Sequence, residues 1–166
     1  MKKTLLFIFS LLSAFVLEAQ EAPVVASFPW EEGFEDVSSL SSWTIINNNG
    51  STSDNWSRVS SYSYRHGGNY GMQSSYNSSA SCNEWLVSPS MQLPADAEGF
   101  TLKWWVKGSS YDGNMAHYVV LVFPASNAAA LQPFDSVSLQ ADTLWSESYG
   151  VAAFAERSAS IESYAG

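Results

Sequence analysis

The sequence has few of the residues that enzymes and nucleic-acid-binding proteins depend on. It contains one cysteine in 166 residues, so no internal disulfide can form. Seven Lys plus Arg stand against sixteen Asp plus Glu, which gives a formal net charge of −9. An acidic surface repels phosphate backbones, so we expect no nucleic-acid partner. The fold must be held by packing, to which bound metal ions can add.

Signatures of catalysis are also missing. The chain has no Gly-x-Ser-x-Gly elbow, no His-Glu-x-x-His motif and no glycine-rich phosphate loop after a strand. It has two histidines: His66 lies in a predicted loop, and His117 begins a predicted strand. We therefore predict that the chain is not an enzyme. One catalytic alternative stays open, a small glycoside hydrolase that uses two carboxylates of an N-terminal acidic cluster. This cluster consists of Glu31, Glu32, Glu35 and Asp36.

The N-terminus has the layout of a secretory signal peptide over residues 1–19. Lys2 and Lys3 precede the apolar run 5–16, and Ala19 is a small residue suited to the position before a cleavage site. The run is too short to span a bilayer, which needs about 20 apolar residues. We expect a secreted or outer-surface protein with no stable membrane insertion. Cys82 lies far from the cleavage site and is expected to be a small buried apolar residue.

After a short leader at 20–27, the remaining chain is long enough for one domain. It is rich in apolar and aromatic residues, which make up 46% and 14% of the whole chain. Short apolar segments alternate with Ser, Asn and Gly clusters, and the long stretch 60–81 is a polar excursion. The best strand candidates are 43–46, 55–59, 85–87, 100–107, 117–123 and 156–161. Strands at this spacing, with helices nearly absent, predict an antiparallel sandwich.

Two of these strands carry a readable facial pattern. In the first, Leu102, Trp104 and Val106 share one face, and Trp105 lies on the other face between two lysines. The second, 117–123, is apolar on both faces, so we expect a central strand that is covered on each side.

The order of several motifs resembles the cleaved-adhesin family, also called choice-of-anchor J. These motifs are Phe34-Glu35, the strand at Trp43, Trp56, Trp-Leu-Val-Ser-Pro at 85–89 and the strand at 118–122. The family comprises MAM-like jelly rolls of secreted Bacteroidetes-type surface proteins. The resemblance implies an all-β, antiparallel jelly-roll β-sandwich over 28–166. It also implies a non-catalytic adhesion or ligand-binding domain that binds a host or matrix protein or a glycan.

The resemblance carries two further expectations. The chain ends at Gly166, where the family continues into further strands. We therefore expect a domain that is incomplete at its C-terminus. Its expected partner is the missing C-terminal part of the same polypeptide. Family members also carry structural calcium, with the Glu of Phe-Glu as a ligand, which implies a calcium role for Glu35.

Other residues could complete a calcium site on chemical grounds, because Ca²⁺ takes carboxylate, amide and carbonyl oxygens. Asp54 and Asp112 are candidates, although Asp112 precedes a glycine and could equally be an ordinary turn residue. Asn47 and Asn49 could add amide oxygens. In the segment 47–54, Asn side chains stand where a calcium loop would mostly carry carboxylates.

Aromatic residues are the candidates for ligand binding. Trp105, flanked by Lys103 and Lys107 on its face, could stack on a sugar ring or anchor a protein, or could pack under a covering loop. The polar excursion has the composition of an adaptable binding loop. Its tyrosines are Tyr62, Tyr64, Tyr70 and Tyr76. An accessory carbohydrate-binding module of a secreted hydrolase is therefore a second alternative.

Two short motifs resemble acceptor sites of Bacteroidetes-type O-glycosylation. Asp-Ser-Val places the acceptor at Ser136, and Asp-Thr-Leu places it at Thr143. Both residues are expected to lie in a loop, as an acceptor requires.

Overall fold

The computed structural model describes residues 23–50, 55–75, 82–108, 110–111, 114–129 and 135–165. In this part of the chain the elements are β-strands and short 3-10 turns, without α-helix. The strands are β1 (Val24–Val25), β2 (Thr44–Asn47), β3 (Trp56–Val59), β4 (Gly71–Ser74), β5 (Glu84–Val87), β6 (Ser90–Met91), β7 (Thr101–Val106), β8 (Ser110–Tyr111), β9 (Asn114–Val122), β10 (Asp142–Tyr149) and β11 (Ala155–Ser160). The 3-10 turns are η1 (Ser39–Ser42), η2 (Tyr62–Tyr64), η3 (Ala125–Ala129) and η4 (Glu162–Tyr164).

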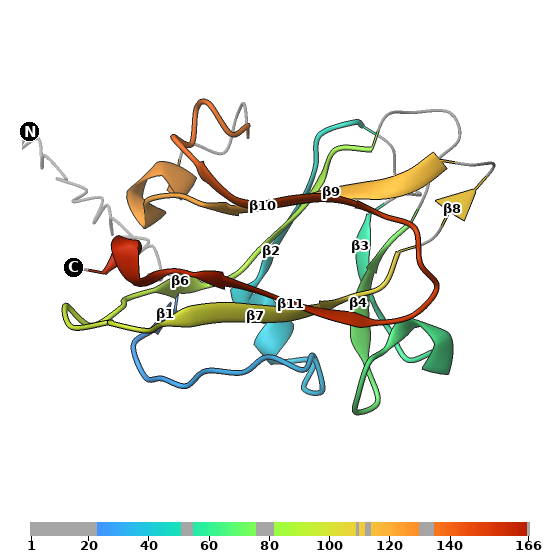
Figure 1. The fold of residues 1–166 in the computed structure, drawn as a ribbon, viewed down its shortest axis with the longest axis horizontal. Coiled ribbons are helices and arrows are strands. Elements are labelled where there is room, and N and C mark those ends of the chain that lie inside the picture. The colour runs from blue at the N-terminus through green and yellow to red at the C-terminus, as the bar shows by residue number, and fades with distance from the viewer. Residues whose placement is uncertain are drawn as a thin grey trace, which may run out of the picture.

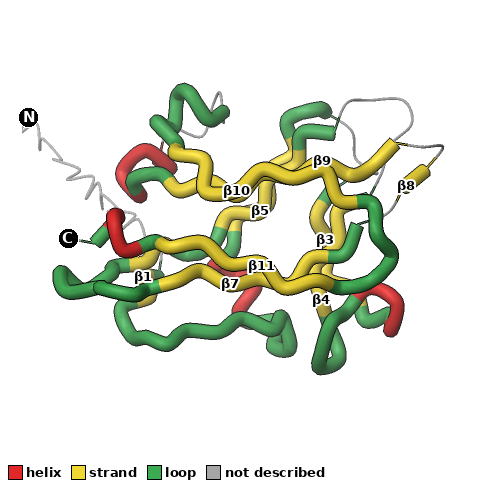
Figure 2. Tube along the Cα trace, in the orientation of Figure 1, coloured by secondary structure: helices red, strands yellow, loops and turns green. Residues whose placement is uncertain are grey.

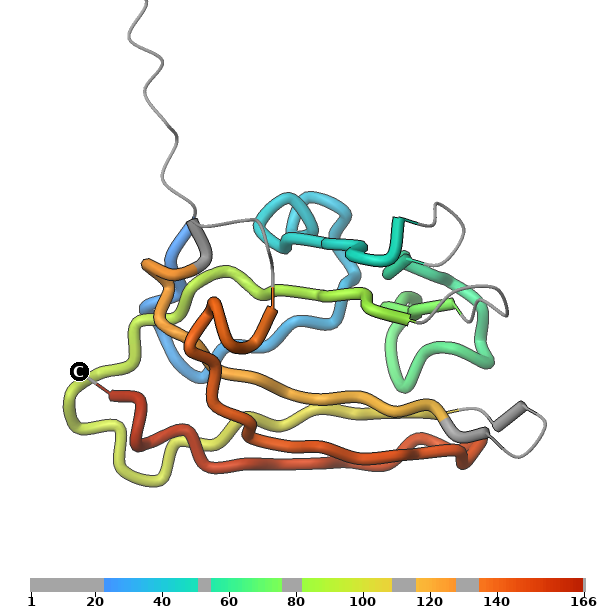
Figure 3. The backbone as a smooth tube through the Cα atoms, turned by 90° about the horizontal axis from the view of Figure 1, so that it is seen from above, coloured from blue at the N-terminus to red at the C-terminus, as the bar shows by residue number. Residues whose placement is uncertain are grey.

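The strands form two layers, which confirms the predicted β-sandwich. Figure 3 shows β7, β9, β10 and β11 on one side and β2 to β5 on the other. Pairing is antiparallel in β7–β11, β9–β10, β8–β9, β2–β5 and β3–β4, and parallel only in the short pair β1–β6 among the described strands. Figure 2 shows that the connections between strands are mostly loops.

The alternation predicted for the strand at 101–106 is confirmed. Along β7, Leu102, Trp104 and Val106 are partly buried, while Thr101, Lys103 and Trp105 are exposed. The ring of Trp104 meets that of Trp145 edge-on at 5.7 Å between centroids. Side chains of the inward face therefore come from both strand pairs of the layer, as a sandwich interior requires.

Complete burial is rare in this sandwich. The buried apolar residues of the described chain are Ala97 and Leu139, which are 2% and 1% exposed. Most other apolar side chains are only partly covered. Ring contacts such as Phe28–Phe100 and Trp104–Trp145 therefore add to the apolar packing of the sandwich.

A polar cluster joins the two strand pairs β9–β10 and β7–β11. Glu147 of β10 accepts hydrogen bonds from both Nε and Nη2 of Arg157 on β11, at 2.8 and 2.6 Å. The same carboxylate accepts from the Tyr118 hydroxyl at 2.9 Å and from Trp145 Nε1 at 3.0 Å. Trp104 Nε1 donates to the Tyr118 hydroxyl at 3.3 Å. Side chains thus connect β10 and β11, which have no backbone pairing with each other.

Aromatic contacts attach the N-terminal segment to the sandwich. Phe28 meets Phe100 edge-on at 5.4 Å, and Trp43 contacts both Trp30 and Phe34 at 6.2 and 5.3 Å. In Figure 1 this segment runs below β7 before the chain enters η1 and β2. It therefore places the Phe34-Glu35 motif beside the strands.

Two expectations about local structure are wrong. Thr143 lies in β10 rather than in the expected loop. The polar excursion 60–81 contains β4. In β10 several polar residues are exposed, and β4 has only four residues, of which Gly71, Gln73 and Ser74 are weak strand formers, so both strands lack a clear strand signal. Ser136 lies exposed in a turn as expected, and its glycosylation stays a prediction.

The strand at 117–123 and the cysteine also differ from expectation. From His117 to Val122, β9 pairs with β10 alone among the described strands, and Val119 is exposed, so the strand is not covered on each side. Cys82 is exposed rather than buried, because it lies in the connection before β5 and connections run over the surface. The predicted signal peptide lies outside the described residues. None of the helices described is long and apolar enough to cross a membrane.

Candidate functional site

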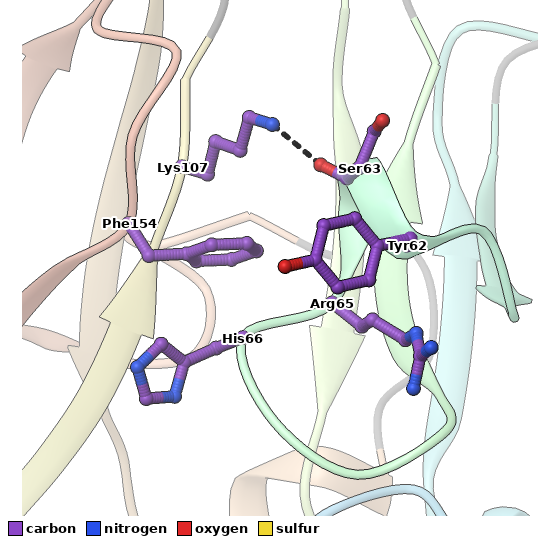
Figure 4. Close-up of a pocket in the computed structure, with 6 residues that line it drawn as sticks. All are labelled: Tyr62, Ser63, Arg65, His66, Lys107 and Phe154. Atoms are coloured by element: carbon purple, nitrogen blue, oxygen red, sulfur yellow. Dashed lines mark hydrogen bonds between the residues drawn. The ribbon is translucent and has the colours of Figure 1, made fainter.

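A cavity of about 300 Å³ opens where the loop after β3 meets the end of β7. It is lined by Tyr62, Ser63, Arg65, His66, Lys107 and Phe154, and we call it the aromatic pocket. Figure 4 shows that its side chains come from three segments, with Phe154 and Lys107 on one side and Tyr62 and Ser63 on the other. Residues far apart in sequence therefore converge on one small cavity, as in ligand sites of other proteins.

The rings of His66 and Phe154 line one wall of the aromatic pocket, and the ring of Trp105 supports His66. The imidazole of His66 lies flat on the indole of Trp105, with ring centroids 3.6 Å apart and planes 9° apart. His66 also meets Phe154 edge-on at 5.5 Å. Trp105 is 47% exposed, so it is neither fully covered nor a bare platform. It supports His66, and His66 lines the cavity.

Two cations flank the rings. Lys107 Nζ donates to the carbonyl of Ser63, which ties β7 to η2, and it lies 5.7 Å from the centroid of the Phe154 ring. The Arg65 guanidinium lies 5.6 Å from the Tyr62 ring centroid and donates to the carbonyl of Gly68. Cation–π contacts at this range hold both side chains near the aromatic surface.

Glu35 holds the loop that carries Arg65 and His66. Its carboxylate accepts from the backbone N–H of Asn69 and Tyr70, at 2.7 and 3.1 Å, and from Asn69 Nδ2 at 3.2 Å. The N–H of Asn69 keeps the pKa of Glu35 below its ordinary value. Gly68 has φ +61°, and a Cβ there would clash with the Glu35 carboxylate, so only glycine fits this close approach.

The predicted ligand-binding residues are only partly brought together. Tyr62 lines the aromatic pocket and is 85% exposed. Trp105 does not line the pocket but stacks on His66, which does. Tyr64 is adjacent, with Lys107 Nζ 5.9 Å from its ring. Tyr70 instead lies under the Arg58 guanidinium, 3.2 Å from its ring centroid. Tyr76 lies outside the described residues.

Sequence reasoning missed His66, Arg65, Ser63 and Phe154 as pocket residues. The one sequence feature that pointed to the pocket was the shared strand face of Trp105 and Lys107, which indicates only the side of the pocket formed by the end of β7. Phe154 lies in the connection between β10 and β11, and no pattern in the sequence indicates that this connection meets the loop after β3.

Among the described residues, no group of three or more His, Cys, Asp or Glu could hold a metal ion, and the calcium roles of Glu35, Asn47 and Asn49 stay predictions. Three N–H donors already occupy the Glu35 carboxylate. Asn47 Oδ1 accepts from the Asn49 backbone at 3.0 Å, and Asn49 Nδ2 donates to Glu84 at 2.7 Å. Asp54 and Asp112 lie outside the described residues.

Two of the N-terminal acids, Glu32 and Asp36, bind the nearby backbone. Glu32 accepts from the N–H of Phe34 at 2.5 Å, and Asp36 accepts from the N–H of Ser38 at 2.8 Å. The Ser38 N–H keeps the pKa of Asp36 below its ordinary value. A glycosidase acid needs a raised pKa. Asp36 and Glu35 are shifted the opposite way, so neither fits the general acid of the hydrolase alternative.

Comparison with known proteins adds one finding. A family model described as Cleaved Adhesin Domain matches residues 28–156, which include every residue of the aromatic pocket. No curated protein and no solved structure matches the chain.

Proposed function

The chain belongs to the Cleaved Adhesin Domain family, and from this premise we propose that it is an adhesion domain that binds a glycan in the aromatic pocket. Family membership suggests a non-catalytic role in a surface or secreted protein that binds external partners. The choice of a glycan, and of a host surface as its source, is our proposal.

The observation that carries the proposal is the buttressed ring stack beside polar groups. Aromatic faces can pack against the apolar side of a sugar ring, and hydroxyl, carbonyl and ammonium groups at the edge can bond its hydroxyls. The Tyr62 hydroxyl points toward the space beside Phe154 in Figure 4. Because Trp105 and Phe154 hold His66 in place, little ordering is needed when a ligand binds.

The test is a glycan array probed with the whole chain and with Tyr62→Ala. Tyr62 is 85% exposed, so its truncation should leave the melting temperature unchanged while array binding falls at least about tenfold, as expected for the loss of an aromatic contact. Val137→Ala is the matched control, because Val137 is 84% exposed but lies outside the pocket.

Two results would contradict the proposal. The first is glycan binding that is unchanged in Tyr62→Ala. The second is that the chain binds no glycan on the array but does bind purified host proteins in a separate assay. Preference for plant or microbial polysaccharides over host glycans would instead favour the accessory carbohydrate-binding module.

Calcium support is a second proposal, and it rests on the ionised Glu35 and the amide-rich segment 47–49. A carboxylate offers about four lone-pair sites, and N–H donors occupy three at Glu35. Calcium would therefore share Glu35 with the loop 65–70, and its binding would stiffen the aromatic pocket.

The calcium proposal predicts that a chelator lowers the melting temperature of the whole chain and that added Ca²⁺ restores it. A ligand of the native state stabilises by about 2.7 kcal/mol at a hundredfold excess over Kd. Glu35→Gln should destabilise the loop in any case, so the decisive readout is whether the chelator effect disappears in this variant. Identical melting curves of the parent chain with and without chelator would rule calcium out.

A further inference from the structure

Two of the five cations in the described part of this acidic chain lie together at one place. Of seven Lys plus Arg, two precede the described residues, which leaves five. Arg58 donates to the carbonyls of Phe34 and Glu35, and Arg157 is paired with Glu147. Lys103 Nζ lies 3.9 Å from Glu156. The remaining two, Arg65 and Lys107, both line the aromatic pocket.

Among the described residues, no carboxylate lines the aromatic pocket, although the chain has sixteen. A cleft lined by one sign of charge focuses the field and raises the local concentration of the opposite ion. The net charge of −9 of the whole chain repels anions. We therefore expect an anionic ligand to be favoured in the pocket over the acidic surface of the rest of the chain.

Size and wall chemistry narrow the ligand further. About 300 Å³ is at the lower end of ligand cavities and suits a single sugar ring. The rings of Tyr62, His66 and Phe154 offer apolar faces, which a small inorganic anion would not use. Figure 4 shows Lys107 and His66 on either side of Phe154, with the Arg65 guanidinium beyond Tyr62. A ring against Phe154 would thus place a substituent near Lys107.

We propose that the aromatic pocket selects sugars that carry a carboxylate, with the sugar ring on the aromatic wall and the carboxylate on Lys107. This inference rests on the proposed function and adds the substituent that the pocket requires. Arg65 supports the same selection through its field rather than by direct contact.

A matched pair of sugars tests the carboxylate. Methyl glucuronide and methyl glucoside differ only in a carboxylate against a hydroxymethyl group, and both are titrated into the whole chain by calorimetry or saturation-transfer NMR. A charge-assisted hydrogen bond predicts that the glucuronide binds about tenfold tighter at low salt. The preference should shrink as salt is raised, because exposed charges are screened.

Two lysine variants locate the effect. Lys107→Met keeps the aliphatic stem and should reduce glucuronide binding to the level of the glucoside. Lys103→Met is the control, because Lys103 lies on β7 four residues before Lys107 and outside the pocket, and it should leave the preference intact. Melting temperatures of both variants show whether loss of the Lys107–Ser63 bond has disturbed the loop.

The outcomes separate this inference from the proposed function. Equal binding of the two sugars overturns the carboxylate selection and leaves glycan binding standing. Binding of neither sugar, together with an empty glycan array, overturns both. An aspartate-rich peptide that binds the pocket tighter than the glucuronide and competes with it would show a protein ligand and overturn the inference. Sialyl and uronyl glycans on the array distinguish the source of the carboxylate.

Discussion

At the scale of single residues, the polar cluster around Glu147 is the best-defined contact of the sandwich. One carboxylate receives four hydrogen bonds, from Arg157, Tyr118 and Trp145. The Arg157 guanidinium is the largest cause that lowers the pKa of Glu147, to about 2. Burial raises the pKa of Tyr118, so this group stays a neutral donor at physiological pH. The cluster requires an ionised Glu147.

This ionisation predicts a pH dependence of stability. Because the folded pKa of Glu147 is depressed from 4.5 to about 2, its contribution is fully present above pH 4.5 and is lost as the pH falls toward 2. The melting temperature should therefore drop in that window, and Glu147→Gln should lower it at pH 7 and flatten the drop. Glu98→Gln is the control, because Glu98 is exposed and lies outside the cluster, and it should leave the drop unchanged. An unchanged slope in Glu147→Gln would contradict the assignment.

At the scale of elements, the two faces of β7 have different roles: one packs in the sandwich interior and the other supports the aromatic pocket. Its inward face packs Trp104 against Trp145, and its outward face presents Trp105 to the loop that carries His66. Two neighbouring tryptophans therefore have different tasks because successive side chains of a strand point to opposite faces.

The strand predicts different costs for truncating its two tryptophans. Trp104→Ala removes a ring at the interior face, where loss of a fully buried aromatic costs about 3–5 kcal/mol, and this partly covered ring should cost somewhat less. Trp105→Ala should cost clearly less stability but weaken ligand binding by releasing His66. Urea denaturation and glycan titration of both variants measure this. A stable Trp104→Ala together with an unfolded Trp105→Ala would invert the faces.

At the scale of the whole molecule, the layer of β7, β9, β10 and β11 consists of two separate strand pairs. β10 and β11 follow each other through residues 150–154, yet β10 pairs with β9 and β11 pairs with β7. The Glu147–Arg157 ion pair joins these two strands through side chains instead. The outer strands β7 and β9 each have a long ladder partner on one side only among the described strands. An outer edge of this kind is a template for pairing with another chain.

We expect these edges to drive self-association. The apparent mass in sedimentation velocity should rise with protein concentration, and Val119→Lys on β9 should shift the rise to several-fold higher concentration, because an edge lysine opposes strand pairing. Ser38→Lys adds the same charge outside the strands and should have no such effect. A parent chain that stays monomeric across the concentration range would show that the edges are protected.

The sequence alone determined the class of fold, most strand positions and the family, because these depend on local alternation and on motifs such as Trp85–Pro89 that the chain carries in order. It also determined which face of β7 holds Trp105. Only the tertiary structure decided what meets that face. The segment after β3 and the connection at Phe154 lie about 90 residues apart in the sequence. The hydrogen bonds of Glu35 to the loop 65–70, together with the close approach that Gly68 allows, hold the segment after β3 against β7. Such contacts join loops with no periodicity, so no local pattern encodes the pocket that they form.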